Sequence, residues 1–140
     1  MTSLPAANPG SAFPAQGPAL IYIVDDEPML VDLAELILKG DGYRIKKFHA
    51  PEPALKSFLA ESVLPALLVT DYVMGAMTGM DLAVQCKAKH PGLRILMLSG
   101  TVGPEILVGA PIRIDRFLAK PYQAQILREM VSEMTPSERD

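Results

Sequence analysis

The sequence has few of the residues that covalent cross-links, soft-metal sites or membrane spans require. Its single cysteine excludes an internal disulfide, and no CxxC or Cys/His spacing indicates a zinc site. No apolar run approaches the roughly 18 residues that span a bilayer, and the first residues lack the basic start of a secretory signal. These absences predict a soluble protein of a reducing, cytoplasmic compartment.

Basic residues and glycine-rich phosphate loops are also scarce. Lys and Arg number 13 against 16 Asp and Glu, for a formal net charge of -3, which argues against nucleic-acid binding. Neither a GxxxxGK nor a GxGxxG pattern is present, so we expect no nucleotide, flavin or dinucleotide site. What is present is a chain of 140 residues, 49% of them hydrophobic, which suits one domain with a single core.

The chain divides into a tail, a folded domain and a short end. Residues 1–18 contain four prolines, no charged side chain and no periodicity, which predicts a flexible tail. Strand and helix patterns alternate over residues 19–135, and residues 136–140 read as a flexible C-terminal end. We therefore expect one domain at 19–135.

Five short segments predict strands, mostly as apolar runs too short for helices, whereas the second is more polar, as an edge strand would be. They lie at 19–24, 43–49, 66–70, 94–98 and 115–119. Apolar residues at helical spacing predict helices between the strands and after the last one, whereas prolines and glycines in 101–111 leave space only for a short helix around 105–108. This alternation predicts a parallel sheet with helices on both faces.

Polar side chains follow four of these strands. Asp25 and Asp26 follow the first, Asp71 the third, Ser99 the fourth and Lys120 the fifth. Taken singly, the acids could cap helices, the serine could form a turn and the lysine could be solvated. Because ligands of such sheets bind at the carboxyl ends of the strands, the joint placement favours one functional crevice.

The chemistry of that crevice follows from its charges. Three converging carboxylates repel each other unless a cation neutralises them, and hard oxygen ligands favour Mg²⁺. Lys120 and Ser99 offer an ammonium and a hydroxyl to phosphoryl oxygens. Asp71 could therefore accept a phosphoryl group, provided that the donor supplies a high-energy phosphate.

In order and approximate spacing, these residues together with Lys120-Pro121 resemble the receiver domains of two-component response regulators, over about residues 19 to 135. The resemblance implies an α/β, flavodoxin-like, doubly wound sheet of order 2-1-3-4-5, here with a short or irregular fourth helix. It implies that Asp71 receives a phosphoryl group from a histidine kinase or phosphotransfer protein. The protein would then be a phosphoacceptor rather than an enzyme.

The resemblance also implies residue roles. Asp26 and Asp71 would bind Mg²⁺ with the backbone carbonyl of Val73, and Asp25 would assist through water. In the family, the hydroxyl at the Ser99 position turns toward the phosphoryl group.

An aromatic three residues before the lysine, here Phe117, swings inward with that hydroxyl in the family. An ordinary core position for Phe117 remains the alternative. The peptide bond before Pro121 is expected to be cis.

Three departures from the family concern the loops. Gly75 stands where the family usually has proline, Gly100 replaces a small alanine, and 101–115 lacks a clear fourth helix. The apolar residues 106–108 are either core or an exposed patch that recruits a partner.

Six residues follow Met134, the last residue of the final helical stripe, so we expect a stand-alone phosphorylatable switch or phosphorelay member with no output domain. Its output would pass to an unknown downstream protein through the fourth helix, fifth strand and last helix, a face that could also form a homodimer. A receiver-like interaction module that is never phosphorylated is the alternative. A phosphohydrolase is disfavoured because Val73 occupies the place of its second acid.

Overall fold

The computed structural model describes residues 18–136, so the expected flexible segments at 1–18 and 136–140 lie outside the described residues except for Pro18 and Pro136. Strands and helices alternate as the sequence predicts. The strands are β1 (Leu20–Val24), β2 (Arg44–Phe48), β3 (Leu67–Asp71), β4 (Arg94–Ser99) and β5 (Arg116–Ala119). The helices are α1 (Pro28–Lys39), α2 (Pro51–Ala60), α3 (Gly79–Lys89) and α4 (Ala124–Met134), with a 3₁₀ helix at Pro104–Leu107.

The five strands form one parallel sheet in the order β2-β1-β3-β4-β5, which confirms the predicted flavodoxin-like fold. The register brings the carboxyl ends of neighbouring strands level. Val24, the last residue of β1, pairs with Thr70 of β3, and Asp71 pairs with Leu98 of β4. Side chains that follow these strands are therefore delivered to one edge of the sheet.

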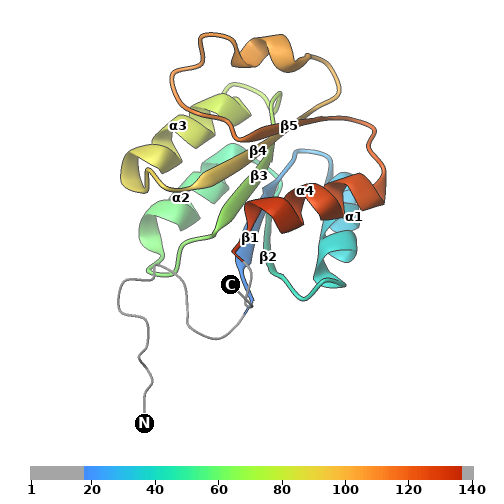
Figure 1. Cartoon of the computed structure of the whole chain (residues 1–140). Coiled ribbons are helices and arrows are strands. Elements are labelled where there is room, and N and C mark those ends of the chain that lie inside the picture. The colour runs from blue at the N-terminus through green and yellow to red at the C-terminus, as the bar shows by residue number, and fades with distance from the viewer. Residues whose placement is uncertain (1–17, 137–140) are drawn as a thin grey trace.

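Helices α2 and α3 lie on one side of the sheet and α1 and α4 on the other (Figure 1), and an apolar layer lies under each pair. Successive residues of a strand point to opposite faces, so Ile21 and Ile23 pack under α1 and α4, whereas Tyr22 and Val24 pack under α2 and α3. Cys86 is buried in the second layer, which suits a packing residue. Both faces of β3 are covered, because every residue of this strand is buried.

Helix α3 begins with a capping box. Thr78 Oγ1 accepts the N–H of Asp81 at 3.1 Å, and Asp81 Oδ2 accepts the N–H of Thr78 at 2.9 Å. Two amide donors that the helix leaves unpaired are thus satisfied. The capping box fixes where α3 starts and, with it, the length of the loop after Asp71.

The connection from β4 to β5 contains only the 3₁₀ helix Pro104–Leu107, so the short helix expected around 105–108 is present one residue earlier. In Figure 1 this orange segment arches above the sheet. Val108 is 84% exposed, and Ile106 and Leu107 are half-buried and belong to neither apolar layer. Of the two alternatives for these residues, the core position is therefore wrong.

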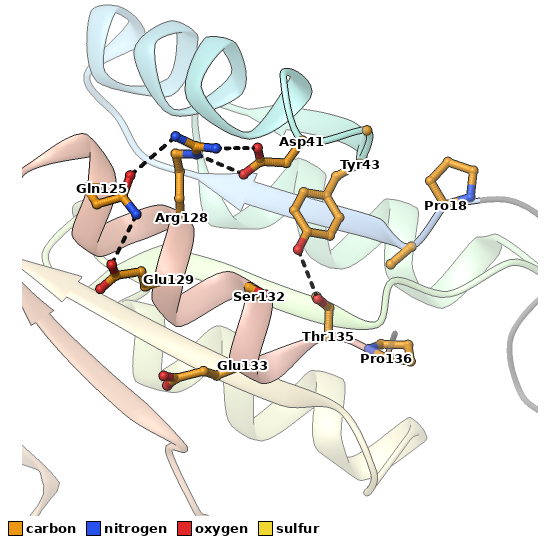
Figure 2. Close-up of a pocket in the computed structure, with 12 residues that line it drawn as sticks. Pro18, Asp41, Tyr43, Gln125, Arg128, Glu129, Ser132, Glu133, Thr135 and Pro136 are labelled. Carbon is orange, nitrogen blue, oxygen red and sulfur yellow. Dashed lines mark hydrogen bonds and ion pairs between the residues drawn. The ribbon is translucent and has the colours of Figure 1, made fainter. Parts of the chain in front are cut away.

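Helix α4 is tied to the turn between α1 and β2 (Figure 2). The guanidinium of Arg128 donates to both carboxylate oxygens of Asp41, at 3.0 and 2.8 Å, and the hydroxyls of Tyr43 and Thr135 lie 3.2 Å apart. A polar cavity of about 740 Å³ lies along these contacts and has none of the predicted site residues in its lining. Within residues 18–136, no helix is both long and apolar enough to cross a bilayer.

Candidate functional site

Three carboxylates meet at the carboxyl edge of the sheet. Asp25 and Asp26 follow β1 and Asp71 ends β3, and one oxygen from each lies within 4.8 Å of the others. Asp25 and Asp71 are buried, whereas Asp26 is exposed to solvent. A set of hard oxygen donors with one open side is what Mg²⁺ prefers, so these residues fit that ion.

Lys120 brings positive charge to this cluster from the end of β5. Its Nζ lies 2.9 Å from Asp25 Oδ2 and 3.5 Å from Asp71 Oδ1, and its side chain is only 12% exposed. A solvated surface lysine, one of the ordinary alternatives for this residue, is therefore wrong. The ammonium is held between two buried acids, where its charge is weakly screened.

Asp25 is fixed from three sides. Its main-chain N–H donates to Phe48 O at 3.1 Å, and its Oδ1 accepts the N–H of Glu27 at 3.0 Å, while Oδ2 accepts from Lys120. The N-cap of α1 is Glu27, whose side chain makes no capping hydrogen bond. Asp25 is therefore not the N-cap residue of α1; it orders the turn before the helix and holds Lys120.

The cluster changes the protonation of its members. The pKa of Asp71 is raised to about 6, first by burial and then by the negative charge of Asp25, while the charge of Lys120 acts in the opposite direction. Burial lowers the pKa of Lys120, but its hydrogen bond to Asp25 and the negative charges of Asp25, Asp71 and Glu27 together outweigh this effect, so that pKa is raised. Lys120 thus stays charged, while Asp71 titrates close to neutral pH.

The two predicted switch residues lie near this edge but differ in their contacts. Ser99 is buried, and its Oγ accepts the N–H groups of Thr101 and Val102 at 3.2 and 3.0 Å, so it orders the turn after β4. Phe117 is half-buried and packs against the layer under α2 and α3. The Lys120-Pro121 peptide bond is cis, as expected.

The loop after Asp71 explains one departure from the family. Gly75 has φ +110°, a backbone conformation that proline cannot adopt because its ring fixes φ near −65°. Further along, the N–H of Gly79 donates to Tyr72 O at 2.8 Å, and a Cβ on Gly79 would overlap the main-chain oxygen of Asp71. The start of α3 therefore lies directly against the backbone of Asp71.

Two residues near the site were not among the predicted ones. Glu27 Oε1 lies 3.5 Å from Lys120 Nζ, and the signal for it was its place directly after the acidic pair. The pKa of Tyr122 is raised by burial and by the charge of Asp25, which places its hydroxyl in the field of the cluster. No sequence pattern marked Tyr122 except its position after Lys120-Pro121.

Known proteins share both the sequence pattern and the fold. The chain is 29% identical over 136 residues to the alkaline phosphatase synthesis transcriptional regulatory protein SphR of Synechococcus elongatus, covering 91% of this chain and 49% of the relative. It is 26% identical over 109 residues to the probable transcriptional regulatory protein TcrX of Mycobacterium tuberculosis, covering 77% and 46%. The chain thus spans about half the length of these relatives.

A solved structure agrees with the fold. The CheY-like response regulator receiver domain protein of Methanospirillum hungatei has a TM-score of 0.76 and 25% identity, over 84% of this chain and 93% of its own. A family model described as the response regulator receiver domain matches residues 21–132, most of the chain and all of the acidic cluster. The chain therefore belongs to the response regulator receiver domains of two-component systems.

Proposed function

We propose that this receiver accepts a phosphoryl group on Asp71 from a phosphohistidine of a histidine kinase or phosphotransfer protein, and that it signals by contact with a further protein. The observation that carries the proposal is the pairing of a buried Asp71 with Lys120, 3.5 Å away, inside a cluster of acids. An isolated structural acid would not need two further carboxylates beside it. The interaction module that is never phosphorylated gives no reason for this arrangement.

In the proposed reaction, a carboxylate oxygen of Asp71 attacks the phosphorus of the donor. The new O–P bond forms as the P–N bond to the donor imidazole breaks, and the imidazole keeps the electron pair of that bond. Lys120 is placed to neutralise the charge on the phosphoryl oxygens.

Asp26 and Asp71, with the backbone carbonyl of Val73, would hold Mg²⁺, and Asp25 would assist through water. The ion would add positive charge where the phosphoryl oxygens collect negative charge.

The proposed switch begins at Ser99. Its hydroxyl now accepts from the N–H groups of Thr101 and Val102, so turning toward a phosphoryl group would release both amides. That release would rearrange the segment that leads into Pro104–Leu107, and Phe117 would move with it. The exposed residues of this segment, Val108 above all, would then present a different surface to a downstream partner.

The output is proposed to be protein contact by a stand-alone receiver. The relatives named as transcriptional regulators are about twice as long as this chain, so a longer protein is the competing arrangement. An immunoblot of native cells separates the two. A band at 15.1 kDa is expected, and a band near twice that mass would contradict stand-alone output.

The phosphoacceptor proposal is tested by intact mass spectrometry after incubation with Mg²⁺ and acetyl phosphate. We expect the mass of one phosphoryl group on the wild type and on Asp32→Asn, an exposed acid on α1, and none on Asp71→Asn. No gain on a folded wild-type protein would favour the interaction module. Rapid multiple turnover of acetyl phosphate would instead indicate a phosphohydrolase.

A further inference from the structure

Lys120 is shared by three carboxylates, and only two of them belong to the proposed metal and acceptor set. Besides Asp25 and Asp71, its Nζ lies 3.5 Å from Oε1 of Glu27. An ammonium has three donors, so each can point to one acid. Glu27 is therefore a fourth acid of the site that neither the metal nor the phosphoryl group requires.

The backbone holds Glu27 at the mouth of the site. Its N–H donates to Asp25 Oδ1 at 3.0 Å, and its carbonyl accepts the first N–H groups of α1, from Leu30 and Val31. The side chain is 64% exposed, whereas that of Asp71 is 9% exposed. The main chain is thus fixed while the exposed carboxylate stands beside Lys120, on the solvent side of the buried Asp71.

The charge balance of the site makes that position matter. Asp25, Asp26 and Asp71 face the single cation Lys120 that the described residues pair with them, and a bound Mg²⁺ would bring this set to neutrality. Glu27 then leaves the mouth with one uncompensated negative charge. Every phosphodonor is an anion, so this charge opposes its approach.

Resting on the proposed phosphoacceptor function, we propose that Glu27 is a selectivity-determining residue that slows phosphorylation of Asp71 by free anionic phosphodonors in proportion to their negative charge. A protein donor contributes contacts over a larger surface and is less affected by a single charge at the mouth. Glu27 therefore favours protein donors over small metabolite-like phosphates.

The size of the effect follows from Coulomb's law. Glu27 Oε1 and Asp71 Oδ1 both lie 3.5 Å from the same nitrogen, so they are closer than the roughly 8 Å over which physiological salt screens exposed charges. At about 7 Å in water, one pair of unit charges changes a rate about threefold. Removing the charge of Glu27 should thus accelerate a monoanionic donor about threefold and a dianionic donor about sevenfold at low salt.

The experiment compares Glu27→Gln with the wild type in the presence of Mg²⁺ at pH 7. Initial rates of Asp71 phosphorylation are measured by intact mass with acetyl phosphate, a dianion, and phosphoramidate, which carries one net negative charge. We expect the rate of Glu27→Gln to exceed the wild-type rate by a larger factor with acetyl phosphate than with phosphoramidate. Both rate increases should become smaller at about 1 M salt, where the screening length is roughly 3 Å. Glu27→Asp keeps the negative charge and should therefore be phosphorylated nearly as slowly as the wild type.

Glu133→Gln is the matched control, because Glu133 is 61% exposed and also paired with a basic residue, Arg116, but on β5 and α4. Equal rates for wild type and Glu27→Gln, equal gains with both donors, or the same gains in Glu133→Gln would each overturn the inference while leaving Asp71 as the acceptor. Labelling of neither wild type nor Glu27→Gln would overturn the proposed function itself, and the inference with it.

Discussion

Asp71 carries a carboxylate in a place that water hardly reaches, since its side chain is only 9% exposed, and the ammonium of Lys120 lies 3.5 Å away. Its pKa therefore rises from 3.8 to about 6, chiefly through burial. Between these values the folded state binds more protons than the unfolded state. The contribution of Asp71 to stability is thus fully present below about pH 4 and is lost as the pH rises through about 6.

Asp71→Asn should consequently stabilise the metal-free protein at pH 7.5, by about 1 to 3 kcal/mol, because it removes a poorly solvated charge. The gain should decrease toward pH 4.5, where the wild-type acid is largely protonated. Urea unfolding in EDTA at three pH values measures the gain in the free energy of unfolding and its decrease at lower pH. A difference that stays constant between pH 4.5 and 7.5 would contradict the burial argument.

Gly79 is the second residue on which the site depends, because α3 starts against the main chain of Asp71. In Gly79→Ala the new methyl group would overlap the Asp71 carbonyl oxygen and lie 3.0 Å from Met97 Sδ. We expect a loss of about 2 kcal/mol or more and slower phosphorylation, since relief requires the acceptor backbone to shift.

The control for Gly79→Ala is Gly40→Ala. Gly40 has φ −62°, and a Cβ at this position would lie no closer than 3.7 Å to any other residue outside its immediate chain neighbours. The same substitution should therefore be neutral or slightly stabilising there. Urea midpoints of the two variants give the comparison, and a Gly79→Ala protein as stable as Gly40→Ala would show that the overlap is easily relieved.

At the residue scale, the sequence predicted which acids lie together but not which contacts the individual side chains make. Asp25, Asp26 and Asp71 could be placed together because the carboxyl ends of neighbouring parallel strands meet at one edge. The place of Glu27 directly after the acidic pair indicated that it lies near the site, but its contact with Lys120 depends on how the loop after β1 turns. The orientation of the Ser99 side chain was also open, since its oxygen accepts two backbone N–H groups of the following turn.

Among the elements, the loop between β3 and α3 combines a glycine at positive φ with a capped helix start. Gly75 has φ +110° and no atom within 4 Å of a built Cβ, so any side chain there meets backbone strain without steric overlap. Gly75→Ala should cost about 1 to 2 kcal/mol in the free energy of unfolding.

Gly92→Ala serves as the reference for Gly75→Ala, because Gly92 lacks a positive φ and its nearest neighbour is the His90 ring at 3.9 Å. It should change stability by less than about 0.5 kcal/mol. Thermal or urea unfolding of the two variants measures the difference. Equal changes in stability would mean that the loop readjusts around position 75 without strain.

The element pattern was predictable wherever an apolar run is bounded by turn residues, and less so at the edges. Strand β5 was expected to begin at Asp115, but the Asp115 carboxylate accepts the N–H of Ile95 at 2.8 Å and the strand begins at Arg116. The 3₁₀ helix begins at Pro104 because the Glu105 carboxylate folds back onto the N–H of Gly103. Side chains that replace backbone partners leave no periodic signal in the sequence.

Taken as a whole, the molecule has two apolar layers with a five-stranded sheet between them. Ile23 and Val69 share the layer under α1 and α4 and stand opposite each other on β1 and β3, whereas Ile95 of β4 belongs to the layer under α2 and α3. Contacts within a layer are direct, while contacts between layers pass through the backbone of the sheet.

Double-mutant cycles should reveal this division. Ile23→Val and Ile95→Val should each cost about 0.5 to 1.5 kcal/mol, and their costs should add within about 0.5 kcal/mol. Ile23→Val combined with Val69→Ala should deviate from additivity by more, because the two cavities adjoin. Coupling across the sheet as strong as coupling within a layer would refute the division.

The sheet therefore separates two sets of side chains that can change independently of each other. Substitutions can accumulate under α2 and α3 without requiring compensation under α1 and α4. A lineage could in this way refit one side of the sheet to a new partner while the opposite side keeps the domain folded.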